Sequence, residues 1–301
     1  AVVVTYNRKD LLKECLDALL NQTYPLDSII LIDNASTDGT PEFLKEKGYL
    51  DNPKIDYVRL PENTGGAGGF HEGVKRGYKK GYDWLWLMDD DVKPDIECLK
   101  NLLFFKKNKK VLVPIRLDKD LKIQEYAALK YNINKFFSKD PREVSVSSFY
   151  HDIKTMPEVI EIQDFSFEGP LINRNIIKKI GYPNKDFFIL FDDTDYSLRI
   201  KYIAKEKIFL IKNAKIYRIL PISKGINMKW KEYYYFRNFF YMHHKYGKNI
   251  VIKIKPIFFV AGYIFKNIFK LNFKKFKIFF YALVDSYKNP MPKRFLPGSK
   301  I

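Results

Sequence analysis

Two groups of acidic residues each follow a short apolar run, and their residue types and spacing could do chemistry. Asp89, Asp90 and Asp91 follow the run WLWLM, which is aromatic and aliphatic and so predicts a buried strand. Three like charges at one point destabilise a fold unless a cation or a hydrogen-bond network neutralises them. At the carboxyl end of a parallel strand, such a group is typical of a site for a hard divalent cation and a diphosphate. A solvated acidic turn explains the same residues, and the motif alone does not decide between the two.

The second acidic group follows the run FFIL, where a helix is expected to begin. It contains Asp192, Asp193 and Asp195. The helix dipole favours negative charge at this position, which explains one or two of the three carboxylates. The remaining carboxylate is a candidate general base, because burial and like-charged neighbours raise the pKa of a carboxyl group.

A glycine-rich segment, GGAGG at residues 65–69, is a third candidate. Glycines let the backbone approach a ligand closely, and this segment opens a helix whose first N–H groups favour anions. It matches neither the dinucleotide motif G-x-G-x-x-G nor a P-loop. A flexible loop is the alternative. Asp33 offers a similar choice, since it could accept from a ribose hydroxyl or could cap a turn.

The elements that must position these residues alternate between strand and helix. Strands are expected at 1–5, 28–32, 55–60, 84–88 and 111–115, and helices over 11–20, 41–47, 67–78 and 95–106. Later strands are expected at 165–169 and 208–211, and later helices over 173–180 and 193–204. Repeated strand–helix units predict an α/β fold, a mostly parallel sheet with helices on both faces. Ligands of such sheets bind beyond the carboxyl ends of the strands, where the polar segments converge.

Composition narrows the class of protein. The chain has 301 residues, of which 46% are hydrophobic, enough for one large domain with an appendage. Cys15 and Cys98 lie far apart in helical patterns, so neither a disulfide framework nor a CxxC metal motif is expected. This cysteine usage fits a reducing compartment such as the cytoplasm, and no signal-peptide pattern is visible before the first strand.

Charge is unevenly distributed along the chain. The formal net charge is +18, and residues 233–284 contain no Asp or Glu but ten Lys or Arg and eighteen Phe or Tyr. Nucleic acid and an anionic membrane are both candidate partners, although no apolar run is long enough to span a bilayer. One helical face is expected to hold Phe265, Ile268, Phe269, Phe276, Phe279 and Phe280, with Lys266, Lys270, Lys274 and Lys277 opposite. We expect this segment to lie on an anionic membrane, and packing against the rest of the chain is the alternative.

Taken together, these segments resemble family 2 glycosyltransferases of the GT-A fold, in particular bacterial galactofuranosyl- and rhamnosyltransferases. The resemblance covers residues 1–246 and rests on VVVTYNR, LIDNASTDGT, NTGGAGGFHEGV, WLWLMDDDV, FEGPLINRNIIKKIGYP and FFILFDDTDYSLR, in this order. It implies a GT-A catalytic domain over 1–245. The region 246–301 would then be a helical, basic and aromatic segment that associates with a membrane or joins subunits.

The resemblance also implies roles for individual residues. Asp193 would be the catalytic base, with Asp192 binding the acceptor. Asp89 and Asp91 would be the DxD pair that holds Mn²⁺ or Mg²⁺. The nucleotide-sugar donor would contact Thr5, Asn7, Arg8, Asp33, Asn63, Gly65, Gly66, Asp89, Asp90, Arg218 and Arg237, the last within a YYxxRN segment.

Arg218 departs from the family pattern. Members often place a histidine metal ligand after the strand that follows the base helix, and the segment AKIYR has Arg218 at that place. A charged arginine cannot ligate a metal. Either the metal rests on the aspartate pair, the diphosphate and water, or Arg218 neutralises the diphosphate directly.

The sequence therefore predicts an inverting glycosyltransferase that moves galactofuranose or rhamnose from a UDP or dTDP donor to a growing, lipid-linked cell-surface glycan. We expect it at the inner face of the cell membrane, with no nucleic-acid partner. Two alternatives stay open: a catalytically inert, nucleotide-binding membrane scaffold and a basic nucleic-acid-binding protein. The latter leaves the acidic and glycine-rich strand ends unexplained.

Overall fold

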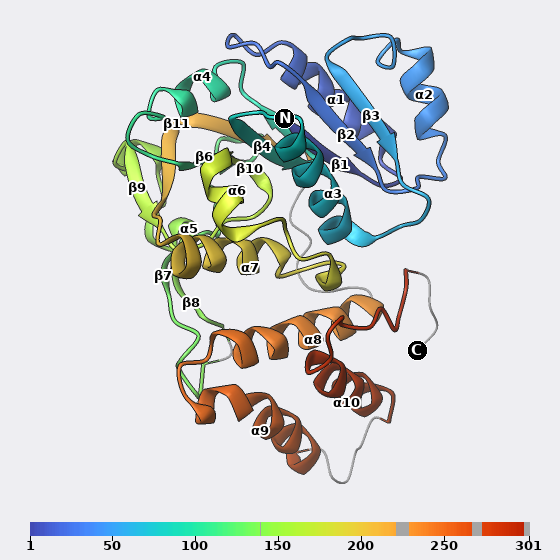
Figure 1. Cartoon of the computed structure of the whole chain (residues 1–301). Helices are drawn as coiled ribbons and strands as arrows, with labels where there is room; N and C mark the ends of the chain where they lie inside the picture. The colour runs from blue at the N-terminus through green and yellow to red at the C-terminus, as the bar shows by residue number, and fades with distance from the viewer. Residues whose placement is uncertain (139, 221–228, 267–272, 298–301) are drawn as a thin grey trace.

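One mixed sheet forms the centre of the molecule (Figure 1). The computed structural model describes residues 1–138, 140–220, 229–266 and 273–297. Within them, the sheet has the strand order β3-β2-β1-β4-β10-β6-β11-β5, and β9 pairs with β11. The first four strands in this order are parallel, whereas β10 is antiparallel to both of its neighbours, β4 and β6. The expected parallel arrangement therefore holds for the N-terminal part of the sheet, and the antiparallel β10 makes the sheet a mixed one.

The strands are β1 (Val2–Thr5), β2 (Ile29–Asp33), β3 (Ile55–Arg59), β4 (Trp84–Asp89), β5 (Val92–Pro94), β6 (Val111–Leu117), β9 (Val159–Ile162), β10 (Glu168–Asn173) and β11 (Ile208–Arg218), with β7 (Ala128–Tyr131) and β8 (Arg142–Ser145) forming a separate ribbon. The helices are α1 (Lys9–Leu20), α2 (Thr40–Glu46), α3 (Gly65–Lys79), α4 (Cys98–Leu103), α5 (Val146–Phe149), α6 (Arg174–Ile180), α7 (Asp192–Arg199), α8 (Lys229–Tyr246), α9 (Ile250–Lys266) and α10 (Phe273–Ser286).

Helices cover both faces of the sheet, as the sequence predicts. Successive strand residues point to opposite faces, so Val2 and Val4 pack with α3, α6 and α7, whereas Val3 packs with α1, α2 and α4. Each face has its own cluster of fully buried apolar side chains. Both cysteines are free and buried.

The structure shifts some predicted elements and adds others. The strand expected at 165–169 lies at Glu168–Asn173, because Phe165 and Phe167 pack into the core before the strand begins. The helix expected over 193–204 is α7 followed by a π-helical turn, Ile200–Ala204. Residues 117–162, for which the sequence indicates no clear elements, contain the β7–β8 ribbon, α5 and β9.

Three helices, α8, α9 and α10, form a separate layer below the sheet in Figure 1. Their shared core includes Tyr233, Phe240, Val260 and Phe279. No helix in the described ranges is long and apolar enough to cross a membrane. Because α8 packs with the two later helices, the helical layer begins at Lys229 within the described residues, ahead of the boundary expected at residue 245.

The aromatic face expected over residues 265–280 is divided in the structure. Phe279 is buried between α8 and α9, against Phe236, Phe259 and Tyr263. Phe265 and Phe280 are instead exposed, Phe265 to 82%. Ile268, Phe269 and Lys270 lie outside the described residues. Part of the predicted face thus holds the three helices together.

Candidate active site

A cavity of about 380 Å³ opens where β1 and β4 end, between the sheet and the helical layer. Its walls come from segments far apart in the sequence: the end of β1, the start of α3, the acidic turn after β4, the segment before α7, and the first turn of α8. The lining residues are Val4, Thr5, Tyr6, Arg8, Asn34, Asn63, Gly65, Gly66, Asp89, Asp90, Phe188, Ile189, Trp230, Lys231 and Pro297. This is the strand edge at which ligands of α/β sheets bind.

Arg8 partly neutralises the acidic turn after β4. Its Nη1 lies 3.2 Å from Asp90 Oδ1 and 3.0 Å from Asp91 Oδ2. The Thr5 hydroxyl donates to Asp90 Oδ2 at 2.6 Å. These contacts fix Asp90, which is buried, and they supply a cationic partner that local sequence around the acidic turn does not reveal.

Asp89 is less well compensated. No described residue donates a hydrogen bond to its carboxylate, and burial together with Asp91, Glu168 and Asp90 raises the pKa of Asp89 well above its usual range. For Asp90, burial raises the pKa to about 6, although Arg8 and Thr5 act in the opposite direction. A cation at Asp89 would relieve this repulsion, and carboxylate oxygens are the ligands that hard cations prefer.

The residues at this turn fit a divalent cation only with help from a ligand. Among the described residues, no group of three or more His, Cys, Asp or Glu is arranged to hold a metal ion by itself. A cation on Asp89 and Asp91 would therefore take its other ligands from phosphate oxygens or water.

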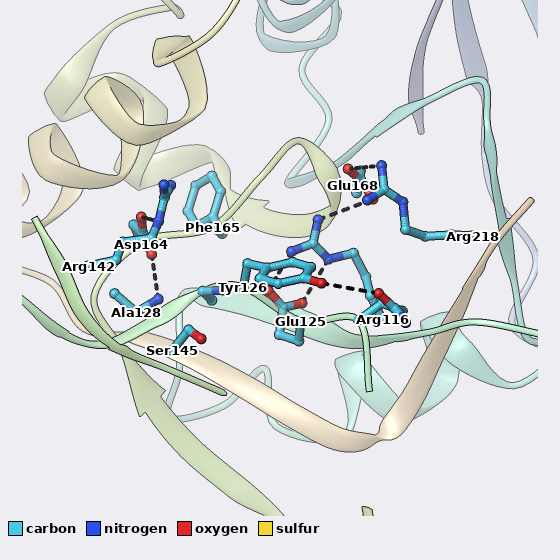
Figure 2. Close-up of polar contacts among 12 residues, drawn as sticks. Arg116, Glu125, Tyr126, Ala128, Arg142, Ser145, Asp164, Phe165, Glu168 and Arg218 are labelled. Carbon is cyan, nitrogen blue, oxygen red and sulfur yellow. Dashed lines mark hydrogen bonds and ion pairs between the residues drawn. The ribbon is translucent and has the colours of Figure 1, made fainter. Parts of the chain in front are cut away.

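Figure 2 shows a row of paired charges that includes Glu168, whose charge contributes to the raised pKa of Asp89. Arg218 Nη2 is 3.1 Å from Glu168 Oε1, and Arg116 Nη1 is 3.1 Å from Glu168 Oε2. Arg116 also donates twice to Glu125, at 2.9 and 2.6 Å. Arg218 lies on β11 opposite Val92, directly after the acidic turn, and is not among the residues lining the cavity. Its charge is engaged by Glu168.

The glycine segment closes against the loop before α7. Gly65 has φ +74°, and a Cβ there would lie 2.0 Å from the Phe188 carbonyl oxygen. Asn63 Oδ1 accepts from Gly65 N at 2.9 Å, and Asn34 Nδ2 donates to Gly65 O at 2.8 Å. Gly66 has open space where a side chain would be. Only glycine suits position 65, whereas Gly66 exposes backbone to the cavity.

The segment that carries Phe188 has an unusual backbone. Phe188, Leu190 and Phe191 all have positive φ, between 63° and 68°. Such conformations cost free energy, persist only where surrounding contacts hold them, and cluster at functional sites. Here the contacts come from α8, so the shape of this cavity wall depends on the helical layer.

Arg237 and Asn238 of α8 make those contacts. Arg237 Nη2 donates to the carbonyls of Asp186 and Phe187 at 2.7 and 2.8 Å, and Nη1 donates to the carbonyl of Pro292. Asn238 Nδ2 donates to the carbonyls of residues 187, 189 and 190 at 3.1, 2.8 and 2.8 Å. Both side chains are fully buried. Arg237 therefore supports the cavity wall from behind and is not part of the lining.

Three aspartates begin α7, and they differ in their surroundings. Asp195 is fully buried and accepts from Lys245 Nζ and the Tyr246 hydroxyl, each at 2.7 Å, so it ties α7 to α8. Burial and the neighbouring carboxylate raise the pKa of Asp192 well above its usual range. Burial also raises the pKa of Asp193.

Arg142 of the β7–β8 ribbon supplies a positive charge near Asp193. It donates to Asp164 Oδ2 at 2.7 Å and to Thr194 Oγ1 at 3.1 Å, and it lowers the pKa of Asp193 against the effect of burial. Figure 2 shows Arg142 paired with Asp164, which also accepts from Ala128 N at 2.6 Å. The ribbon thus reaches the candidate base.

The cavity brings together seven of the predicted donor-site residues: Thr5, Arg8, Asn63, Gly65, Gly66, Asp89 and Asp90. The other predicted residues, Asn7, Asp33, Asp91, Asp192, Asp193, Arg218 and Arg237, do not line it. Asn7 instead bonds the backbone of Thr37 at 2.7 Å. Asp33 is fully buried and accepts from Ser36 N and the Tyr57 hydroxyl at 2.8 and 2.7 Å, which is the turn-capping arrangement.

Besides the seven predicted residues, the cavity is lined by eight that sequence reasoning did not assign to the site: Val4, Tyr6, Asn34, Phe188, Ile189, Trp230, Lys231 and Pro297. Asn34 directly follows Asp33 at the end of β2, so the polar residues at that strand end could have identified Asn34 as a lining residue. Lys231 faces the same cavity as Arg8, and burial followed by the charge of Arg8 lowers the pKa of its ammonium group. Two cations beside one cavity favour an anionic ligand such as a diphosphate.

Comparison with known proteins places the chain in a class of enzymes. The sequence profile described as Glycosyl transferase family 2 matches residues 1–181, more than half of the chain, and so the chain belongs to glycosyl transferase family 2. It is a glycosyltransferase with the GT-A fold. The relatives and solved structures described next match between 66% and 96% of this chain.

Two proteins related in sequence have names that specify different sugars. Galactofuranosyltransferase GlfT1 of Mycolicibacterium smegmatis is 27% identical over 201 residues, 66% of this chain and 64% of that protein. The match therefore spans less than two thirds of that relative. The dTDP-rhamnosyl transferase RfbF of Shigella flexneri is 24% identical over 268 residues, 86% of this chain and 84% of that protein.

Solved structures share the fold at low sequence identity. GalNAc-T7, solved with UDP, GalNAc and Mn²⁺, has a TM-score of 0.57 at 16% identity, over 85% of this chain and 53% of that one. The mannosyltransferase PcManGT of Pyrobaculum calidifontis, solved with GDP-Man and Mn²⁺, has a TM-score of 0.55 at 17% identity, over 94% and 73%. TarS 1-349 of S. aureus, solved with UDP, has a TM-score of 0.54 at 14% identity, over 96% and 81%.

Proposed function

We propose that this glycosyltransferase is inverting and takes its sugar from a nucleoside diphosphate donor, UDP or dTDP, bound in the cavity at the ends of β1 and β4. The main supporting observation is the lining itself. Arg8 and Lys231 supply positive charge, Gly65 and Gly66 bring backbone close, and burial with nearby carboxylates raises the pKa of Asp89 despite the charge of Arg8. A diphosphate with a divalent cation complements that combination.

The chemistry then follows from the carboxylates at the start of α7. Asp193 would take the proton of an acceptor hydroxyl, whose oxygen forms a bond to the anomeric carbon as the bond to the diphosphate oxygen breaks. Its raised pKa makes this carboxylate a stronger base than an ordinary aspartate. Asp192 would bind the acceptor beside it. A single in-line displacement inverts the anomeric configuration.

The donor's leaving group needs charge stabilisation. Asp89 and Asp91 would hold Mn²⁺ or Mg²⁺, and such a cation, when bound, neutralises charge on the diphosphate. Arg8 and Lys231 would contribute positive charge at the same end of the cavity. Arg218 would not contact the donor. By pairing with Glu168, it would offset one of the negative charges near Asp89.

Galactofuranose and rhamnose are the sugars we favour, since relatives with these activities match the chain. The acceptor would be a growing cell-surface glycan on a lipid carrier. We place the enzyme at the cytoplasmic face of the cell membrane, where an anionic lipid surface would attract the basic, aromatic segment that follows residue 233.

A panel of nucleotide sugars tests this proposal. Thermal stability would be measured with UDP- and dTDP-linked sugars, with and without Mn²⁺ or Mg²⁺, followed by transfer assays on the sugars that stabilise the protein. We expect stabilisation by one nucleotide class, and its cation dependence should disappear in Asp91→Ala. Unchanged cation dependence in that variant would contradict the metal assignment. Donor binding without any transfer would favour an inert nucleotide-binding scaffold.

A further inference from the structure

The outer face of α9 carries apolar side chains that the described chain leaves uncovered. Ile250, Ile257 and Phe258 are 67%, 47% and 53% exposed, and Phe265 is 82% exposed. Ala261, between them, is exposed as well. Apolar side chains exposed singly are ordinary, whereas a contiguous row of them marks an interaction surface.

These residues form one continuous stripe. At about 100° per residue, positions 250, 251, 254, 257, 258, 261, 262 and 265 fall within an arc of about 140°. All eight are Ile, Val, Phe, Ala or Gly, and seven are exposed, with Ile254 half-buried. The opposite side of α9, which includes Ile252 and Val260, packs into the protein. The helix is thus apolar on the side that faces the core and also on the side that faces solvent.

The turn between β7 and β8 extends this surface. Phe137 in that turn is 95% exposed, and its neighbour Phe136 packs against Phe258 of α9 with ring centroids 5.6 Å apart. Lys255 of α9 donates to the carbonyls of Lys135 and Ser138 at 3.0 and 2.6 Å, which fixes the turn on the helix. Figure 1 shows the β7–β8 ribbon reaching α9.

The charges around the surface select its partner. Lys248 and Lys253 are exposed on and just before α9, and residues 233–284 contain no acidic residue. The one acidic residue in the described part of the ribbon turn, Asp140, is exposed, and its carboxylate accepts from Arg142 N at 2.8 Å. Two copies joined through this face would bring like charges together, since the whole chain has a net charge of +18. An anionic lipid surface offers both the opposite charge and an apolar interior.

We infer that the outer face of α9 and the Phe137 turn together form a membrane-docking surface, on which α9 lies parallel to a bilayer that contains anionic lipids. The aromatic side chains enter the boundary between headgroups and acyl chains, and the flanking lysines contact the headgroups. This inference deepens the proposed function and rests on it, because it names the surface that would bring a lipid-linked acceptor to the site. It assigns docking to α9 and the ribbon turn, whereas the buried Phe279 of α10 serves the helical core.

Point variants test this surface more cleanly than truncation, because Tyr233 and Arg237 of α8 bond to Asp285 and to the carbonyl of Pro292. The test protein is the triple variant Phe137→Ser, Phe258→Ser and Phe265→Ser. The matched control replaces two exposed phenylalanines elsewhere, Phe104 (79% exposed) and Phe149 (61%), with serine. Binding would be measured by co-sedimentation with vesicles of equal parts phosphatidylcholine and phosphatidylglycerol.

We expect the triple variant to lose vesicle affinity by about tenfold or more, while the control binds as the unaltered protein does. Added salt should weaken binding only in part, because the apolar contribution is not screened. Donor turnover in the absence of vesicles should be unchanged in both variants. Vesicle binding requires no sugar donor, so the two proposals can fail separately. If the protein binds vesicles through Phe137 but transfers no sugar, the proposed function is overturned and this inference stands.

A second measurement locates the contact. Because Cys15 and Cys98 are buried, an environment-sensitive fluorophore would label a single introduced cysteine, in Ala261→Cys on α9 or in Phe149→Cys as the control. We expect vesicles to shift the emission of the first label to the blue and to leave the second unchanged. Equal vesicle binding by all variants, absence of binding by the unaltered protein, or a dimer in solution that the triple variant abolishes would each overturn the inference.

Discussion

Gly65 offers a sharp test of how the donor cavity is built. In Gly65→Ala, the new Cβ would lie 2.0 Å from the Phe188 carbonyl oxygen, and the residue would keep a φ of +74°. A left-handed conformation costs an alanine about 1–2 kcal/mol, and the overlap costs about 1–3 kcal/mol. Moving Phe188 away also weakens the 3.1 Å hydrogen bond from Ala67 N. We therefore expect a loss of about 3 kcal/mol in the free energy of unfolding.

Gly66→Ala is the matched control, because its Cβ meets no atom within 4 Å. Both residues line the cavity, so a general effect of a methyl group near the donor would appear in both variants. Urea unfolding would measure stability, and calorimetric titration with UDP or dTDP would measure donor affinity. We expect Gly65→Ala to lose both and Gly66→Ala to retain its stability. Equal stability of the two variants would refute the role assigned to the contact between Gly65 and Phe188.

Three further predictions concern charged groups. Asp193→Asn should lower kcat by about 10²–10⁴-fold with donor affinity retained, as stopped assays and titration would establish, and full activity would move the base elsewhere. Folding raises the pKa of Asp90 from 3.8 to about 6, so its contribution to stability is fully present below pH 3.8 and is lost as the pH rises through about 6. Chemical unfolding at several pH values should therefore show the free energy of unfolding falling by up to about 3 kcal/mol across this window. Asp90→Asn should lack this fall. Arg237→Lys should cost about 2–4 kcal/mol of stability and weaken nucleotide binding, since one ammonium group cannot reach three separate carbonyls; an unchanged chemical unfolding curve would contradict this.

The sequence predicted the strand edge and most of its polar residues because both follow from local patterns. Strands such as β1 and β4 are short, fully apolar runs, and polar residues that end parallel strands must converge at one edge. Asp89 was predicted from such a pattern, whereas the family resemblance implied Thr5 and Arg8, and all three line the cavity. Asp33 was placed at the donor, but its position at the strand end suits a turn cap equally, and its neighbour Asn34 lines the cavity.

The remaining features depend on contacts between distant segments, which no local pattern encodes. The YYxxRN segment was predicted to contact the donor, yet Arg237 does not line the cavity, and its side chain donates to backbone carbonyls of residues 186, 187 and 292. The β7–β8 ribbon has short strands rich in polar residues, so its periodicity is weak, although Arg142 reaches the candidate base. For the aromatic residues after 250, the sequence indicated an amphipathic surface, but only packing separates the buried Phe279 from the exposed Phe265.

One wall of the cavity depends on contacts from α8, which is synthesised after all strands of the sheet. The parallel strands β1 to β4 pair with one another within the first ninety residues, whereas β10 and β11 complete the sheet later in the sequence. The carbonyls of the segment before α7 must wait for Arg237 and Asn238, and Trp230 and Pro297 reach the cavity later than its floor. A chain synthesised only as far as β11 has every strand of the sheet but lacks the groups that shape this wall of the pocket. We therefore expect nucleotide affinity to appear only after α8 has been added to the sheet.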